Sequence, residues 1–408
     1  MTKQSNPHLV TLLSHVSTEF KRYPHIDAAV SLARKSLNLS HPNPAVGCVL
    51  VSPTGNIIGQ GHTQAVGGAH AEVMALRDAT SRGNSAEKST AYVTLEPCSH
   101  FGRTPPCCNA LVEAKVAKVV VAILDPNPLV AGNGVEMLRQ AGIEVEVLPT
   151  DHPQAIAAKE QMIGFFSRMV RKTPWVRMKI AASLDGRTAL QNGQSQWITG
   201  DAARDDGHVW RARTGAILTG SGTVLADDPR LDVRSVKTQR QPHVVIVDSD
   251  MQTPINAKLF TINNIVPQAI DTLARAIFIY KNAQNEAKQA ALVAAGATVI
   301  ELPNSAQSKH VDLRLMLQDL ANREINEVHV EAGATLNGAL IEANLVDEFL
   351  IYLAPKLLSA GRGMADFAPL KQLSDAVALE FVSVERIGED LRIVARPLNR
   401  ANFCRANF

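Results

Sequence analysis

Two neighbouring stretches, GGAHAEVMALRDA at residues 67–79 and EPCSHFGRTPPC at residues 96–107, decide the chemistry and much of the fold of the first third of this chain. They supply one histidine, His70, and two cysteines, Cys98 and Cys107. Three such ligands leave the fourth corner of a tetrahedral zinc ion open for water, which distinguishes a catalytic site from a structural one. Zinc lowers the pKa of that water to about 7. The sequence therefore predicts one catalytic Zn²⁺ per chain.

The spacing within the first stretch constrains the geometry of this site. Residues two apart on a helix point away from each other. His70 and Glu72 can therefore serve one metal ion only if His70 lies at the unwound start of the helix AEVMALRDA. Gly67 and Gly68, just before it, allow such an irregular entry. Glu72 is not a ligand in this arrangement and is predicted to be the catalytic carboxylate that moves protons.

The second stretch places Cys107 at a helix start as well. Cys107 follows two prolines and opens the apolar pattern CNALVEAKV, and a helix N-terminus favours a thiolate. Cys108 leaves that helix about 100° away from Cys107 and is not expected to bind the metal. His100 lies in the loop between the cysteines, where it suits substrate contact or loop packing better than the metal shell.

These motifs carry a family resemblance. HAE followed by PC matches the zinc-deaminase signature H-x-E…P-C-x-x-C, but eight residues separate the two cysteines here instead of two. The longer form, PCSHFGRTPPC, resembles the deaminase domain of the bifunctional riboflavin-biosynthesis deaminase/reductases (diaminohydroxyphosphoribosylaminopyrimidine deaminase / 5-amino-6-(5-phosphoribosylamino)uracil reductase). The resemblance implies a cytidine-deaminase-like αβα sandwich. It also places Asn43, in HPNPAVG, near the substrate, although an Asn between two prolines is commonly a turn residue.

Length, charge and cysteine content limit the class of protein. A chain of 408 residues suggests two domains. The net charge is +2 and the lysines and arginines are scattered along the chain, so the sequence does not indicate a basic surface for binding nucleic acid. The chain has five cysteines, and zinc binding requires two of them as reduced thiolates, which favours a reducing cytoplasm. No apolar run approaches the roughly 18 residues of a membrane span, and the N-terminus lacks signal-peptide features.

The hydrophobic periodicity predicts two successive α/β units in which helices alternate with strands. The first begins with a helix from His25 and a hairpin of AVGCVLV and IIGQGHT, and the second closes with a hairpin around Gly388. The predicted division is an N-terminal extension at 1–22, a first domain at 23–150, a linker with one bridging helix at 151–174, a second domain at 175–398, and a frayed tail, RANFCRANF, within 399–408.

The second unit has no GxGxxG dinucleotide fingerprint. It has two other glycine-bearing junctions between a strand and a helix, ILTGSGTVLADDPRL and HVEAGATLNGALI, whose backbone amides suit phosphate groups. With KIAASLDGRTA and SQWITG, and in this order, they resemble the reductase domain of the same family, which has a dihydrofolate-reductase-like α/β fold. The two resemblances together cover about residues 25–397.

The resemblance implies NADPH as the hydride donor and assigns contacts residue by residue. Cofactor contacts fall on Ala181, Trp197, Thr223, Asp227, Ser249, Gly333, Ala334, Thr335, Leu336, Asn337, Gly338 and Ala339. Substrate contacts fall on Ser195, Arg211, Leu231, Arg234 and Glu331, while Lys179 and Asp185 are candidates for assisting proton transfer. Because the fork of arginine suits phosphate oxygens, Arg211 and Arg234 are predicted to hold the phosphate of the substrate. The 2′-phosphate of NADPH is the competing ligand.

The expected function is a bifunctional step of riboflavin synthesis with a phosphorylated pyrimidine as substrate. Zinc-hydroxide deamination of 2,5-diamino-6-(5-phosphoribosylamino)pyrimidin-4(3H)-one would be followed by NADPH-dependent reduction of the ribosyl group, giving 5-amino-6-(5-phosphoribitylamino)uracil. A cytoplasmic homo-oligomer without membrane or nucleic-acid partners is expected.

Two other classes of function remain open. The first is a nucleic-acid or nucleoside deaminase with an accessory domain, which the cysteine spacing, the near-neutral charge and the few aromatic residues disfavour. The second is a non-catalytic, zinc-stabilised binding module, which requires a fourth protein ligand such as His100 or Cys108.

Overall fold

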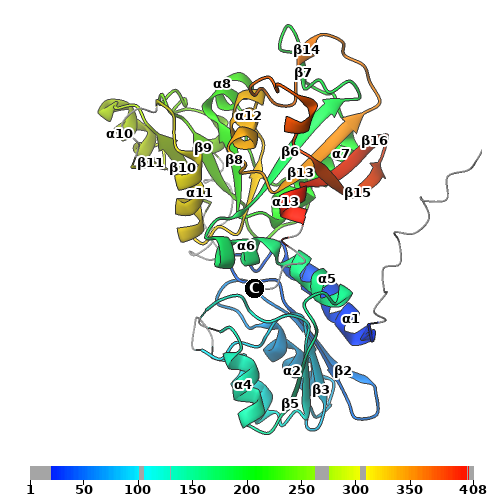
Figure 1. Ribbon diagram of the computed structural model, residues 1–408. Coiled ribbons are helices and arrows are strands. Elements are labelled where there is room, and N and C mark those ends of the chain that lie inside the picture. The colour runs from blue at the N-terminus through cyan, green and yellow to red at the C-terminus, as the bar shows by residue number, and fades with distance from the viewer. Residues whose placement is uncertain are drawn as a thin grey trace, which may run out of the picture.

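The chain forms two lobes joined by a pair of helices (Figure 1). The computed structural model describes residues 20–100, 105–128, 130–261, 275–303, 309–401 and 403. The N-terminal lobe surrounds one sheet and the C-terminal lobe surrounds a second, larger one. Within the described residues no helix combines the length and the apolar character that a membrane crossing requires.

The described part of the N-terminal lobe contains a five-stranded sheet in the order β2-β1-β3-β4-β5. β1 pairs antiparallel with β2 and with β3, which confirms the predicted hairpin, and β3, β4 and β5 are parallel. The strands are β1 (Gly47–Val51), β2 (Ile57–His62), β3 (Thr90–Val93), β4 (Lys118–Val121) and β5 (Glu144–Val147). The helices around them are α1 (Pro24–Ala33), η2 (Arg34–Ser36), α2 (Ala71–Ser81), α3 (Cys107–Glu113) and α4 (Asn133–Gln140).

Two glycines bring helices onto opposite faces of this sheet. A Cβ on Gly47 would lie 1.9 Å from the carbonyl oxygen of Ala29 in α1. A Cβ on Gly61, the partner of Cys48 in the ladder, would lie 2.2 Å from the carbonyl oxygen of Ala71 in α2. Successive positions of a pleated sheet point to opposite faces, so α1 and α2 cover the two sides. The predicted αβα sandwich is confirmed, and α2, which follows His70, is held tightly against β2.

The linker between the lobes contains two helices, α5 (Pro153–Gln161) and α6 (Ile163–Arg171), where the sequence predicted one. Met162 interrupts them with φ −119° and ψ 21°, outside the helical range. Apolar residues of both helices, such as Ala158 and Phe166, belong to the core of the N-terminal lobe. Figure 1 shows α6 between the two lobes.

One described residue of the predicted tail, Phe403, also contributes to that core. Phe403 is buried among N-terminal core residues, and its ring centroid lies 5.8 Å from that of Trp175. The Lys159 ammonium of α5 donates a 2.7 Å hydrogen bond to the Phe403 carbonyl oxygen. The tail therefore ties the linker helices to the far end of the chain. Cys404, the cysteine of this tail, lies outside the described residues.

The described part of the C-terminal lobe contains a nine-stranded sheet in the order β11-β10-β9-β8-β12-β6-β13-β16-β15. It is parallel from β11 to β13, and β15 and β16 form the predicted closing hairpin. The strands are β6 (Trp175–Ser183), β8 (Ala216–Gly220), β9 (His243–Val247), β10 (Ile277–Lys281), β11 (Ala297–Glu301), β12 (Glu327–Val330), β13 (Glu348–Ala354), β15 (Leu379–Ile387) and β16 (Asp390–Pro397), with a separate small ladder of β7 (Ala189–Leu190) and β14 (Gly361–Arg362).

Helices cover both faces of the parallel part of this sheet. Alternate residues of β9 belong to different core clusters. Val245 packs towards α11 (Leu313–Asn322) and α12 (Ala334–Glu342). Val244 and Ile246 pack towards α9 (Lys258–Thr261) and α10 (Glu286–Ala294) on the other face. A strand buried on both faces is a continuous apolar run, as HVVIV shows. The remaining helices are α7 (Asp201–Arg213), α8 (Ser221–Asp227), η5 (Leu373–Asp375) and α13 (Leu398–Ala401).

Candidate active sites

The three predicted zinc ligands come together in the N-terminal lobe. The sulfur atoms of Cys98 and Cys107 lie 3.6 and 3.4 Å from Nδ1 of His70. All three ligand atoms lie within 4.8 Å of one another, and they are the one such cluster among the described residues. One imidazole nitrogen and two sulfurs at this separation are a donor set that suits tetrahedral zinc with an open position.

Each ligand is held by the end of a helix or by the loop beside it. His70 is the N-cap residue of α2, with extended φ and ψ of −76° and 171°, and Gly67 before it has a φ of +83°. Cys107 is the first residue of α3. Both features agree with the geometry expected from the sequence. The short distance between β2 and α2 then directs the start of α2 towards the loop that carries Cys98.

Of the two cysteines predicted to bind zinc as thiolates, Cys98 is the one whose negative charge the start of α3 favours. The backbone N–H of Cys107 donates to the sulfur of Cys98 at 3.3 Å, so the N-terminus of α3 stabilises a negative charge on Cys98. The hydrogen bond from the Cys107 thiol lowers the pKa of Cys98 to about 4, and the same shared proton raises the pKa of Cys107. A bound metal ion deprotonates coordinating thiols outright.

Glu72 lies in the first turn of α2, beside the ligands and almost fully buried. Burial raises the pKa of its carboxyl group to about 6, and the negative charge on Cys98 adds to the rise. A carboxyl group titrating this close to neutrality can both accept and return a proton.

The two side chains excluded from the metal shell lie elsewhere. The Cys108 thiol donates to the carbonyl oxygens of Pro97 and Gly134, so it points into the protein interior. His100 does not belong to the cluster, and its buried Nδ1 has no hydrogen-bond partner among the described residues. A protein donor for the fourth position, which the binding-module hypothesis required, is therefore absent from the described residues.

A second buried carboxylate, Glu96, shapes the loop on the other side of the cysteines and was not singled out from the sequence. Its oxygens accept hydrogen bonds from the backbone N–H groups of Asp125, Gly132, Gly134 and Val135. Burial raises the pKa of the neighbouring Asp125 to about 7. The signal that would have identified this region is the sequence DPNP at residues 125–128, separated from the end of strand β4 by three residues.

The C-terminal lobe contains a cavity of about 1630 Å³ at the carboxyl ends of its parallel strands. Gly333, the N-cap of α12, borders this cavity. A Cβ on Gly333 would lie 3.8 Å from Thr223 Oγ1. Because glycine has no side chain, the backbone at the start of α12 is accessible to a ligand. A helix start of this kind suits a phosphate group. The predicted residues that line the cavity are Lys179, Ala181, Ser195, Trp197, Arg211, Thr223, Asp227, Leu231, Arg234, Ser249, Glu331, Gly333, Ala334, Thr335, Leu336, Asn337 and Ala339.

Glu331, Arg211 and Lys179 form the charged centre of this cavity. Both carboxylate oxygens of Glu331 accept hydrogen bonds from Arg211, and the second of these, from Nη2 to Oε2, measures 2.8 Å. The third arm of the guanidinium donates to the Asp232 carbonyl oxygen at 2.9 Å. The charge of Arg211 holds the pKa of Glu331 far below its usual range, and burial lowers the pKa of Lys179.

The two predicted phosphate-binding arginines therefore differ in their surroundings. Arg211 is mostly buried, and the donors just described are directed at Glu331 and Asp232. Arg234 is half-exposed and contacts the carboxylate of Asp232 through Nη1 at 2.7 Å. Its side chain has the greater freedom to turn towards a ligand in the cavity.

Three predicted residues lie outside this cavity. The carboxylate of Asp185 accepts hydrogen bonds from the Ser183 hydroxyl and from the backbone N–H groups of Leu358 and Ser359, and these hydrogen bonds lower its pKa to about 2. A Cβ on Gly338 would lie 1.7 Å from the carbonyl oxygen of Asp366, so this glycine permits close packing. Asn43 belongs to the N-terminal lobe, four residues before β1.

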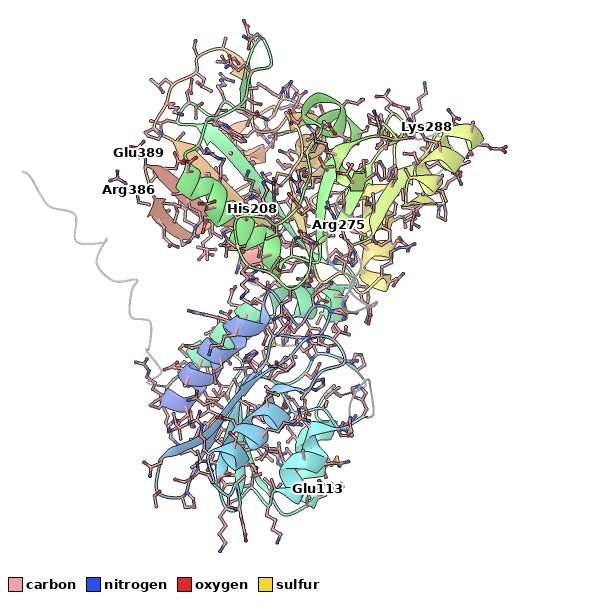
Figure 2. The ribbon with its side chains drawn as sticks, turned by 180° about the vertical axis from the view of Figure 1, so that it is seen from behind. Glu113, His208, Arg275, Lys288, Arg386 and Glu389 are labelled. Atoms are coloured by element: carbon pink, nitrogen blue, oxygen red, sulfur yellow. The ribbon has the colours of Figure 1, made fainter. Side chains whose placement is uncertain are left out.

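Helix α7 brings further side chains to the cavity, although the sequence pattern did not predict a helix there. His208, shown on α7 in Figure 2, is buried, lines the cavity and precedes Arg211 by one turn. Burial, reinforced by Arg211 and Arg234, lowers its pKa to about 4. Arg275, also labelled in Figure 2, donates to the carbonyl oxygens of Arg230 and Leu231 and so holds the loop that contains Leu231.

Family models and known relatives match almost the whole described chain. Residues 21–123 match the cytidine and deoxycytidylate deaminase zinc-binding region, and residues 174–393 match the RibD C-terminal domain. The riboflavin biosynthesis protein RibD of Escherichia coli is 42% identical over 365 residues, which are 89% of this chain and 96% of that protein.

Solved structures agree with this match. Acinetobacter baumannii RibD is 39% identical with a TM-score of 0.79, and the match covers 92% of this chain and 98% of that one. A second solved structure is that of a diaminohydroxyphosphoribosylaminopyrimidine deaminase/5-amino-6-(5-phosphoribosylamino)uracil reductase from Thermotoga maritima. It is 30% identical with a TM-score of 0.76, and the match covers 92% of this chain and 98% of that one. The chain therefore belongs to the RibD family of riboflavin biosynthesis, in which a zinc-binding deaminase domain precedes an NADPH-dependent reductase domain.

Proposed function

We propose that the N-terminal lobe deaminates 2,5-diamino-6-(5-phosphoribosylamino)pyrimidin-4(3H)-one and that the C-terminal lobe then reduces the ribosyl group to give 5-amino-6-(5-phosphoribitylamino)uracil. The observation that carries the first step is the position of the buried Glu72 beside the cluster of His70, Cys98 and Cys107. Residues 23–150 and 175–398 are the proposed domains, joined by the linker at 151–174.

In the deaminase domain, His70, Cys98 and Cys107 would hold zinc, which acts as a Lewis acid that makes water a better nucleophile at neutral pH. Glu72 takes a proton from the attacking water and returns one to the amine that leaves as ammonia. Its pKa of about 6 suits both transfers, because neither protonation state is strongly disfavoured near pH 7. Cys108 has no part in this chemistry.

In the reductase domain, NADPH would supply the hydride, and the chain supplies orientation and charge. Arg211 keeps Glu331 ionised and fixed in position. Lys179, whose pKa is lowered by burial, is the proposed proton donor near the carbon that receives the hydride. Arg234 is proposed to bind the substrate phosphate, and the start of α12 at Gly333 a phosphate of the cofactor.

The proposal is tested with the purified chain and the phosphorylated diaminopyrimidine. One zinc per chain, ammonia release without NADPH, and NADPH oxidation that begins only after deamination are the expected results. Ammonia release from RNA or a free nucleoside, with none from the phosphorylated pyrimidine, would support the alternative deaminase. Zinc binding without turnover of any of these compounds would support a binding module.

We also propose that the chain forms a homo-oligomer through the edge of the second sheet. β15 is the last strand in the sheet order of the described residues, and it exposes Phe381, Val382 and Val384, with Phe381 68% exposed. An open edge with apolar side chains is a surface that a second strand can cover. Sedimentation should give a dimer or larger species that Phe381→Asp dissociates. A concentration-independent monomer would refute the proposal.

A reducing, cytoplasmic location is proposed from the thiols. Cys48, Cys98, Cys107 and Cys108 are free, and the proposed ligands Cys98 and Cys107 must stay reduced to bind metal. Cell fractionation tests this location.

A further inference from the structure

The loop that carries Asn43 has a shape set by its own hydrogen bonds. The Asn43 N–H donates to the carbonyl oxygen of Ser40 at 2.8 Å, and the buried Ser40 hydroxyl donates back to the carbonyl oxygen of Asn43 at 3.1 Å. This closed turn lies between η2 and β1. Its internal bonds do not determine how the turn is oriented relative to the rest of the lobe. The N–H groups of Leu39 and Ser40 donate to the Ser36 carbonyl oxygen and tie the near side of the turn to η2, so the far side, His41 and Pro42, is oriented by what contacts this apex.

The apex is held by Asn326 of the C-terminal lobe. The side-chain amide of Asn326 donates through Nδ2 to the carbonyl oxygen of Pro42 at 2.8 Å. Its Oδ1 accepts a 2.6 Å hydrogen bond from Nε of Arg168 on α6. Because Arg168 can only donate, the oxygen of the amide must face it and the NH₂ must face Pro42. Asn326 is 7% exposed, so this contact is shielded from water.

A second contact involves the neighbouring residue of the loop. Gly215, directly before β8, lies against the ring of His41, and a Cβ at this position would come within 2.7 Å of His41 Cε1. Burial and the nearby Arg240 lower the pKa of His41 well below its usual value. Two consecutive residues of the loop are thus packed against the starts of two strands, β8 and β12, of the C-terminal lobe.

We propose that Asn326 is a positioning residue for deamination: the reductase lobe, through Asn326, holds the turn that presents Asn43 to the pyrimidine. The inference rests on the proposed function and on the expectation, implied by the family resemblance, that Asn43 contacts the deaminase substrate. It goes further, because it makes deamination dependent on a side chain 284 residues away from Pro42 in another domain. Without this hydrogen bond the turn keeps its internal bonds and the contact of His41 with Gly215 but is held less firmly, which weakens substrate binding.

The test compares Asn326→Ala with Glu160→Gln in the full-length zinc protein. Glu160 on α5 pairs with Arg396 of β16, so Glu160→Gln removes a different contact between the linker and the second sheet and leaves the loop intact. In Asn326→Ala the KM for the phosphorylated diaminopyrimidine, measured by ammonia release, should rise about 3- to 10-fold, the range expected for one hydrogen bond. Its kcat, zinc content and reduction of the deaminated intermediate should stay within about twofold. Glu160→Gln should leave the KM unchanged.

A readout without turnover is amide hydrogen exchange of residues 38–46, which should speed up in Asn326→Ala and not in Glu160→Gln. Should Asn326→Ala fold poorly, Asn326→Asp serves in its place. An ionised Asp still accepts from Arg168 and has no N–H for Pro42. The same rise in KM is expected from it.

The effects of Asn43→Ala and Asn326→Ala should be less than additive, because both act on one turn. An Asn326→Ala protein with normal deamination KM, when Asn43→Ala is impaired, overturns the inference. A normal KM in Asn43→Ala also overturns it while leaving the deaminase assignment intact. Absence of ammonia release by the unaltered protein would refute the proposed function itself.

Discussion

The zinc cluster and the reductase cavity are built in opposite ways. The cluster takes its atoms from three residues within 38 positions of sequence, all at or beside helix starts. The cavity takes its lining from residues between Lys179 and Asp366, and its central charges are paired with one another. A metal site needs a few donors at short distance, whereas a cavity for a dinucleotide and a sugar phosphate needs a wide surface.

This difference has a consequence for mutational sensitivity. Removing one donor from the cluster removes the metal and with it the whole reaction. In the cavity, one side chain contributes a fraction of the binding energy, and its role depends on its neighbours. Arg211 and Arg234 illustrate the point, because the same residue type is directed at Glu331 in one case and half-exposed in the other.

The largest effect is expected for Cys107→Ser. This change removes one of three ligands, so zinc should be lost and deamination should fall by at least about 1000-fold. Metal analysis and ammonia release measure both quantities. Cys108→Ser is the matched control and should keep zinc and activity, since that thiol donates to Pro97 and Gly134. Zinc loss in the control alone would mean that the wrong thiol has been identified.

Glu72→Gln should have the next largest effect. The amide keeps the shape of the side chain and cannot take up the proton, so deamination should fall by at least about 100-fold with zinc retained. Steady-state ammonia release together with metal content measures this. Reduction of the deaminated intermediate provides the internal control. Near-normal deamination would require another base, with His100 as the next candidate.

Arg234→Ala tests the reductase cavity, in which each side chain contributes a fraction of the binding energy. If Arg234 binds the substrate phosphate, the KM of the reductase substrate should rise roughly 10- to 150-fold, with the KM of NADPH almost unchanged. Arg234→Lys should restore only part of the loss, because lysine offers a point charge without the fork. Titrations of NADPH and NADH decide between this assignment and the alternative. A loss confined to NADPH would assign Arg234 to the 2′-phosphate of the cofactor.

Asp185→Asn should have the smallest effect. The carboxylate lies outside the cavity and accepts hydrogen bonds from Ser183, Leu358 and Ser359, so NADPH oxidation should stay within about threefold of normal. Glu331→Gln, assayed alongside, should be far more impaired. A loss beyond about tenfold in Asp185→Asn would restore the hypothesis of proton transfer by Asp185.

The sequence was informative wherever chemistry depends on neighbours in the chain. The motif HAE, the PC pair and the glycines before His70 predicted a metal site at two helix starts, and the structure brings those ligands together. Apolar runs such as HVVIV indicated strands, and in the structure this run is buried on both faces of a parallel sheet. Local geometry and hydrophobic pattern are properties of short segments, so they can be inferred without a structure.

The sequence-based prediction was incomplete for residues whose contact partners lie far away in the sequence. DAARDDGHVWRAR, the sequence of α7, has little apolar periodicity, and its helix is held by contacts such as the guanidinium of Arg177 over the ring of Trp210 at 4.5 Å. Cys107 was predicted at a helix start, where it lies, but the sequence did not reveal that its backbone N–H donates to the sulfur of Cys98. Phe403 was placed in a frayed tail, yet it packs against Trp175.

The sequence by itself determined the ligand types, the alternation of strands and helices, and the resemblance that the relatives confirm. Only the tertiary structure decided that Arg211 is directed at Glu331, that Asp185 caps a loop, and that Asn326 contacts Pro42. The physical reason is that a side chain takes its role from the charges and hydrogen-bond partners that surround it. For these residues the partners come from segments that are far apart in the sequence and lie side by side only in the folded chain.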